Sequence, residues 1–180
     1  MEPIEINAGT HYLRQFRADD RLDDRSALLS AFADPAVRAA FPTTTVTTPS
    51  DATAYIDARA AGWRDDDHYT WAVAALTTGT LIGEVRLDLA APTHAAGGDG
   101  DSQTTARLTA WTHPDARGQG VASTAVGTVL RFGFGAIDLA RVEAACAEDN
   151  AAAMALARRC GFGRDSSTDD HALVRWTTHG

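Results

Sequence analysis

Cysteine is rare in this chain: only Cys146 and Cys160 are present, far apart and without a Cys-x-x-Cys motif. The sequence therefore predicts reduced thiols in a cytoplasmic protein and no disulfide framework. Histidine is scarce too, with six residues and no His-x-x-x-His or similar spacing. Since a metal site needs clustered ligands, no metal is predicted.

Long apolar runs and an excess of positive charge are also missing. No apolar segment reaches the length that spans a bilayer, and residues 1–8 contain two glutamates but no basic stretch. We therefore expect neither a membrane span nor a secretory signal. A formal net charge of −8 argues against a nucleic-acid or anionic-membrane partner. The length of 180 residues predicts a single domain, 1–180, and the alanine-, arginine- and aspartate-rich composition suggests a bacterial source.

The order of predicted elements indicates an α/β domain around a mixed sheet. Thr48-Pro49 predicts a helix start, and Asp19 and Asp20 are expected to cap an earlier helix. The alternating segment 81–89 and the apolar segment 71–76 predict a hairpin. The other expected elements are strands at 11–16, 106–112, 141–146 and 171–176, a loop at 90–103, and helices at 121–134 and 150–160.

The most informative segment is Arg117-Gly118-Gln119-Gly120-Val121-Ala122, which joins a predicted strand to a predicted helix. Because the first N–H groups of a helix lack partners within it, such a loop points several donors at one place. Gly118 and Gly120 let a ligand approach the main chain, and Arg117 can pair with a negative charge. The segment therefore predicts a binding site for a phosphorylated ligand.

These six residues also fit the signature Gln/Arg-x-x-Gly-x-Gly/Ala, and the chain resembles the GNAT superfamily of acyltransferases. The stretch from Asn150 to Phe162 is similar to that family's Asn-x-x-Ala/Ser helix ending in Gly-Phe. Several further segments resemble the branch that contains the ribosomal-protein (Rim-type) N-terminal acetyltransferases. They are Leu13-Arg14, Asp34 to Val37, Trp71 to Val73, Leu81 to Gly83 and Asp170. Trp111 to Pro114, directly before the glycine loop, supports the resemblance to the superfamily as a whole.

The resemblance implies a mostly antiparallel mixed sheet with one splayed parallel strand pair, flanked by helices. It also implies acetyl-CoA, or another pantetheine thioester, as the acyl donor and co-substrate, with no metal. The pyrophosphate would lie on the glycine loop and the pantetheine arm in the wedge between segments 106–112 and 141–146. The residues expected at the donor are Trp111, Thr112, His113, Arg117, Gly118, Gln119, Gly120, Val121, Ala122, Ser123 and Asn150.

Three catalytic side chains found in relatives do not carry over, because the matching positions hold Ala145, Ala153 and Ala157. A thiol is acidic enough to leave as thiolate, so the loss of an acid need not abolish transfer. A base must then be found elsewhere in the chain.

Glu84, Asp170 and His171 are the candidates for that base. Glu84 lies on the more polar side of its predicted strand, where an exposed charge near Arg86 is the alternative interpretation. Asp170 and His171 form a carboxylate–imidazole pair suited to general-base work. Since neighbouring residues of a strand point to opposite faces, at most one of the two is expected to face the site.

Two classes of function stay open. The first is an N-acetyltransferase whose acceptor is a small-molecule amine or a protein N-terminus; an acyl carrier protein as donor and a homodimer are further alternatives. The second is a CoA-binding module without activity, suggested by the three alanines. The enzyme is favoured, because acyl transfer between well-positioned reactants needs few side chains.

Overall fold

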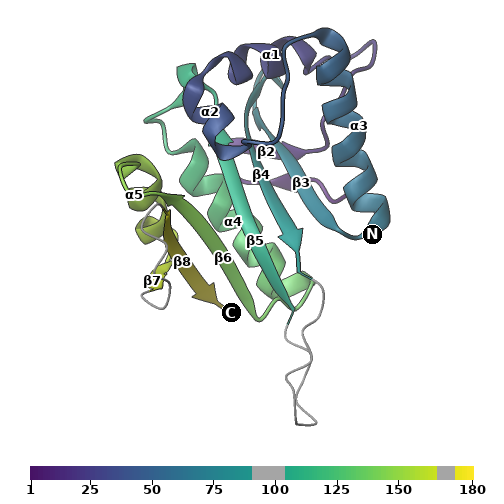
Figure 1. Cartoon of the computed structure of the whole chain (residues 1–180). Coiled ribbons are helices and arrows are strands. Elements are labelled where there is room, and N and C mark those ends of the chain that lie inside the picture. The colour runs from purple at the N-terminus through teal and green to yellow at the C-terminus, as the bar shows by residue number, and fades with distance from the viewer. Residues whose placement is uncertain (91–103, 166–172) are drawn as a thin grey trace.

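The computed structural model describes residues 1–90, 104–165 and 173–180. Within these residues eight strands form one sheet in the order β1-β2-β3-β4-β5-β6-β8-β7, with helices on both faces (Figure 1). The strands are β1 (Ile6–Asn7), β2 (His11–Arg14), β3 (His68–Ala75), β4 (Leu81–Leu89), β5 (Thr105–Thr112), β6 (Arg141–Ala147), β7 (Gly163–Asp165) and β8 (Leu173–His179). The helices are α1 (Arg25–Ala33), α2 (Pro35–Ala40), α3 (Pro49–Asp65), α4 (Val121–Ala136) and α5 (Ala151–Arg159), with a short 3-10 helix η1 (Pro114–Ala116).

The sheet is antiparallel except for one parallel pair, β5 with β6, which confirms the expected mixed topology. This pair is short: its last rung joins Arg107 to Glu143. Beyond that rung β5 stays paired with β4 as far as Thr112, and β6 stays paired with β8 as far as Ala147. Beyond that rung the two strands therefore separate, each held by its other neighbour, and their facing edges do not pair with each other.

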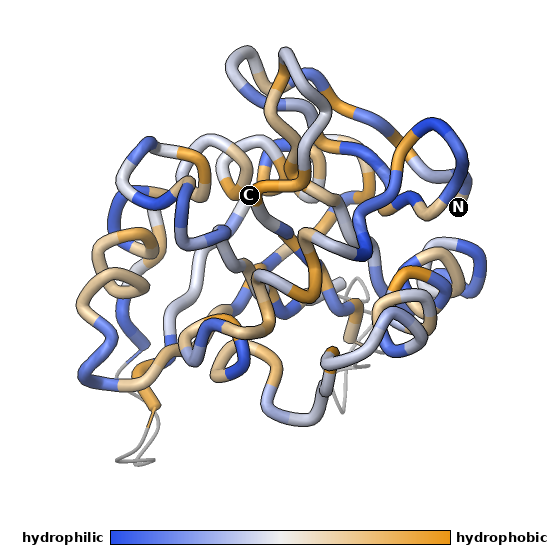
Figure 2. Tube along the Cα trace, turned by 90° about the horizontal axis from the view of Figure 1, so that it is seen from above, coloured by the Kyte–Doolittle hydropathy of each residue, from blue (hydrophilic) through white to orange (hydrophobic). Residues whose placement is uncertain are grey.

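Two apolar clusters hold helices against opposite faces of the sheet. In the first, α4 and α5 pack behind the strands, with residues such as Val129 of α4 near Val142 of β6 (Figure 1). In the second, α1, α2 and α3 cover β2 to β5, with Phe32 and Tyr55 near Trp111. Seen from above, orange hydrophobic stretches run through the middle of the molecule and much of the blue hydrophilic chain lies at the rim (Figure 2). The tryptophans predicted to be core residues are all buried: Trp63, Trp71, Trp111 and Trp176.

Local sequence explains the start of α3. Thr48 accepts a hydrogen bond from the Asp51 N–H at 3.1 Å, and the Asp51 carboxylate accepts from the Thr48 N–H at 2.9 Å. With Pro49 in the first turn, this is a capping box that fixes the helix start. The predicted start of α3 is confirmed.

The expected cap at Asp19 and Asp20 is wrong, because α1 begins only at Arg25. Asp19 instead closes a turn by accepting from the N–H groups of two residues that follow it. The chain before α1 is fixed by a buried ion pair between Arg14 of β2 and Asp24, at 2.7 and 2.8 Å. A partner from a distant strand thus decides where the helix starts.

Two short strands, β1 and β7, were not predicted, since two or three residues give no readable alternation. Strand β8 reaches His179, beyond the predicted end at 176. The predicted loop at 90–103 lies almost wholly outside the described residues. Among the helices the structure describes, none is long and apolar enough to cross a bilayer.

Candidate active site

The loop between β5 and α4 presents a row of free main-chain donors. After η1 the chain passes through Gly118 at φ +74° and Gly120 at φ +80°, which glycine adopts without strain. Within the described chain, no N–H group of residues 118–123 donates to a protein acceptor. These free donors and the positive end of a long helix form a nest of N–H groups that is suited to an anion. The residues of α4 that contribute to it are Val121, Ala122 and Ser123.

Side chains shape this nest rather than line it. The Gln119 amide donates to the carbonyl oxygen of Asp115 at 3.1 Å. The Ser123 hydroxyl donates to the carbonyl oxygen of Gly120 at 2.9 Å. Both contacts are made within the loop and the first turn of α4.

Arg117, the first residue of the loop, forms an ion pair with the Asp34 carboxylate. Its Nη2 and Nη1 donate to Asp34 at 3.0 and 3.2 Å, and its Nε donates to the Thr112 carbonyl oxygen at 3.3 Å. The Arg117 guanidinium lowers the pKa of Asp34 below its ordinary value. Asp34 also caps α2. This ion pair links the nest to the helices of the opposite face. Because the guanidinium is already paired with Asp34, pairing of Arg117 with a ligand stays a prediction.

His113 and Asn150 both make structural contacts. The His113 Nε2 lies 3.1 Å from the Ser30 hydroxyl of α1, and its Nδ1 accepts from the Asp115 N–H at 3.3 Å. The Asn150 side chain accepts from the Ala153 N–H at 3.0 Å and caps α5. Roles of His113 and Asn150 at a donor stay predictions.

The splayed strands place the wedge directly beside the nest. Trp111 is 6% exposed, and its indole N–H donates to Glu84 at 2.9 Å on the face covered by α1 to α3. The Trp111 side chain therefore points away from the wedge, and roles of Trp111 and Thr112 at a donor stay predictions. A ligand arm with amide groups would find backbone donors and acceptors on both walls.

Glu84 is completely buried, so the alternative of an exposed charge is wrong. Its carboxylate accepts from the Tyr55 hydroxyl at 2.5 Å, from Trp111 at 2.9 Å and from the Arg59 Nε at 3.3 Å. The Arg59 guanidinium also stacks 3.7 Å over the Tyr55 ring. Burial, and then the nearby Glu84 charge, raise the pKa of Tyr55 well above its ordinary value.

These contacts form a buried charge cluster that joins α3 to β4 and β5. A carboxylate with three donors and no exposed oxygen is poorly placed to remove a proton from an amine. Glu84 as the base therefore stays a prediction that its surroundings do not favour. The other two candidates, Asp170 and His171, lie outside the described residues.

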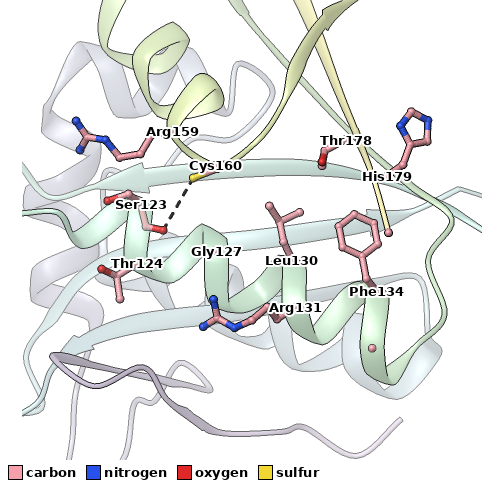
Figure 3. Close-up of a pocket in the computed structure, with 12 residues that line it drawn as sticks. Ser123, Thr124, Gly127, Leu130, Arg131, Phe134, Arg159, Cys160, Thr178 and His179 are labelled. Carbon is pink, nitrogen blue, oxygen red and sulfur yellow. Dashed lines mark hydrogen bonds between the residues drawn. The ribbon is translucent and has the colours of Figure 1, made fainter.

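A groove of about 770 Å³ continues from the nest along α4. Figure 3 shows Ser123 at the start of α4 close to Cys160, which follows α5, with Gly127, Leu130 and Phe134 further along α4. Burial raises the pKa of the Cys160 thiol, which fits an inert side chain in the wall of the groove. Sequence reasoning missed this groove, because it depends on how α4 and α5 pack.

Sequence reasoning also missed a charged hollow on the opposite face of the sheet. It is lined by Arg107, Glu143, Ala144, Ala145, Asp165, Arg175, Trp176 and Thr177. Alternation along the predicted strands shows which residues of one strand share a face. It does not show which residues of neighbouring strands lie beside them, because that depends on strand register. Among the described residues, no group of three or more His, Cys, Asp or Glu side chains is arranged to hold a metal.

A family model described as acetyltransferase (GNAT) domain matches residues 12–163. Among solved structures, a candidate ribosomal-protein-serine acetyltransferase from Vibrio cholerae is 22% identical, with a TM-score of 0.73 and 100% of both chains covered. RimJ from Mycobacterium smegmatis, solved with CoA-disulfide, is 18% identical, with a TM-score of 0.71 and 99% of this chain and 88% of that chain covered. The microcin self-immunity acetyltransferase MccE, solved with acetyl-CoA and AMP, is 15% identical, with a TM-score of 0.70 and 96% and 93% covered. No curated protein matches the chain significantly by sequence.

Proposed function

The chain belongs to the GNAT acetyltransferase family, and on this premise we propose that it transfers an acetyl group from acetyl-CoA to a primary amine within a ternary complex. The observation that carries the proposal is the wedge beyond the Arg107–Glu143 rung, which opens beside a nest of free N–H groups. The acceptor class is either a small-molecule amine or a protein N-terminus. Structures similar in fold contain CoA-disulfide or acetyl-CoA, which supports this donor.

The donor would be held mainly by main chain. The N–H groups of residues 118–123 suit a pyrophosphate, and the groove that begins at Ser123 has room for the nucleotide end. The pantetheine arm would pair with the unpaired edges of β5 and β6. Such a site needs glycines and a helix start rather than particular side chains.

The chemistry follows from this placement. The neutral amine nitrogen attacks the thioester carbonyl carbon, a C–N bond forms, and the C–S bond breaks to release the CoA thiolate. The proton lost by the amine passes to water or to a side chain, and the thiolate needs no acid at neutral pH. A main-chain N–H of a splayed strand is suited to stabilise the oxyanion.

A second candidate function is a CoA-binding module without turnover. It is favoured by Ala145, Ala153 and Ala157 at positions where relatives carry catalytic groups, and by the burial of Glu84. Steady-state release of CoA thiol over a panel of amines and peptides separates the two functions. Tight CoA binding without turnover of any acceptor would favour the module.

Substitution of Gly120 tests the position of the donor. We expect Gly120→Glu to abolish CoA binding in calorimetry, because the new carboxylate lies at the nest and repels phosphate. Gly9→Glu is the matched control: Gly9 has φ +82°, carries the same strain and lies at the far edge of the sheet. If Gly120→Glu binds CoA as tightly as Gly9→Glu does, the pyrophosphate does not lie on this loop.

A further inference from the structure

The charged hollow lies where an acyl acceptor would reach the wedge. Its residues come from β5, β6, β7 and β8. Ala144 and Trp176 belong to the core packed against α4, and the charged residues alternate with such core residues and lie on the opposite face of the sheet. Arg107 and Glu143 form the last rung before β5 and β6 separate. The hollow is therefore at the base of the wedge, across the sheet from the phosphate nest.

Register explains why this place is hollow. Ala145 pairs with Arg175, and Arg175 pairs with Asp165, so that one rung carries a methyl group beside two long side chains. Two rungs earlier, on the same face of the sheet, Glu143 pairs with Thr177. The small side chain of Ala145 leaves a floor between taller charged walls.

The charges that remain available in the hollow are positive. Of its two carboxylates, Glu143 forms an ion pair with Arg141, and Asp165 has an interaction of its own. In contrast, neither Arg107 nor Arg175 has a hydrogen-bond or ion-pair partner within residues 1–90, 104–165 and 173–180. Both guanidiniums are exposed and border the same hollow. Two unpaired guanidiniums at one hollow favour an anionic group.

Size and distance narrow the choice to a small molecule. The hollow has a volume of about 40 Å³, compared with the ~10–15 Å³ needed to hold one water, so it suits a group of about three heavy atoms such as a carboxylate. Arg107 and Glu143 belong both to the hollow and to the last rung before the wedge, whereas Arg175 lies on β8, the next strand, about 4.8 Å from β6. An amine at the wedge and a carboxylate in the hollow would then be separated by only a few bonds.

We infer that this hollow binds the carboxylate of the acyl acceptor through Arg107 and Arg175, and that the acceptor is a small amine of the amino-acid type. The inference rests on the proposed function and deepens it by naming the acceptor class. A protein N-terminus is the competing acceptor class. It differs from an amino acid because its amine has no free carboxylate within a few bonds.

The test compares amino acids with their carboxamides, which keep the amine and remove the negative charge. With the wild-type protein, kcat/KM is expected to favour amino acids by roughly 10- to 100-fold, as for a charge-assisted contact. Arg107→Gln and Arg175→Gln should each reduce this ratio toward one, without changing the KM for acetyl-CoA. Arg164→Gln is the control: Arg164 is exposed on β7, but its rung belongs to the other face of the sheet.

A second measurement keeps the inference testable without turnover. N-acetyl amino acids and N-acetyl amino-acid amides are titrated by calorimetry into the CoA-bound protein. Preferential binding of the acid that is lost in Arg107→Gln and Arg175→Gln supports the inference even if no amine is acetylated; in that case only the proposed function fails. Equal binding of acid and amide, or faster acetylation of N-terminal peptides than of any amino acid, would overturn it.

Discussion

The ion pair between Arg117 and Asp34 leads to a prediction about donor affinity. Asp34→Asn removes the negative charge that occupies the Arg117 guanidinium, while an asparagine oxygen can still cap α2. The guanidinium is then available to the pyrophosphate, and a carboxylate that would repel the donor is gone. We expect CoA to bind more tightly to this variant.

The magnitude follows from the exposure of the pair. The Arg117 and Asp34 side chains are 43% and 19% exposed, and a solvent-accessible pair of this kind contributes about 0.5–1 kcal/mol. At 1.4 kcal/mol per tenfold change, its release corresponds to about a 2- to 5-fold lower Kd for CoA. Since the pKa of Asp34 is lowered, the pair contributes to stability above the ordinary aspartate pKa of about 3.9 and is lost only as pH falls through the lower folded value. A measurement at pH 7.5 therefore finds the pair fully formed.

Calorimetric titration with CoA at 0.15 M salt provides the measurement. Asp115→Asn is the matched control, because Asp115 lies on the same loop, is 91% exposed and makes no contact with the Arg117 guanidinium. It removes the same charge without releasing Arg117. If Asp34→Asn binds CoA no more tightly than Asp115→Asn, or binds it more weakly than the wild type, the two groups do not compete.

Three further outcomes concern stability. In urea unfolding, Tyr55→Phe should lower the free energy of unfolding by about 1.5–3 kcal/mol, because the Tyr55 hydroxyl donates to the buried Glu84 carboxylate. Tyr12→Phe removes a similar hydrogen bond at the surface and should lower it by less than about 0.5 kcal/mol. Equal losses would contradict a central role for the buried cluster. Burial lowers the pKa of His68, so stability should decrease as pH falls through the ordinary histidine pKa of about 6.5, and His68→Gln should flatten this pH dependence between pH 7.5 and 5.5. Gly62→Ala should lower the free energy of unfolding by more than about 1 kcal/mol, because a Cβ there would lie 2.3 Å from the His68 ring. An unchanged urea midpoint would mean that the ring moves freely.

The features that the sequence predicted correctly depend on neighbours along the chain. The start of α3 needs only Thr48, Pro49 and Asp51, which lie within one turn. The same holds for the left-handed Gly161 after α5 and for the glycine loop before α4. In each case the main-chain conformation and its partners are local, so residue types and spacing suffice.

The features that the sequence did not predict depend on partners far along the chain. Asp24 does not cap α1 with its side chain, because Arg14 of β2 takes its carboxylate. Glu84 alternates like an exposed residue, yet α3 supplies Tyr55 and Arg59 to satisfy it in the core. The hydrophobic pattern of a strand says which residues share a face, but it does not say what covers that face.

The two sides of the candidate site differ in the same way. On the proposed donor side, free N–H groups and splayed strand edges would do the binding, and the signal in the sequence is a short local pattern of glycines. On the acceptor side, Arg107, Glu143 and Arg175 meet only because β5, β6 and β8 pair in one particular register. Side chains on adjacent strands can be exchanged without disturbing the sheet or the nest. The acceptor proposed for this chain therefore depends on long-range register, and the Arg107 and Arg175 variants test that register-dependent part of the site.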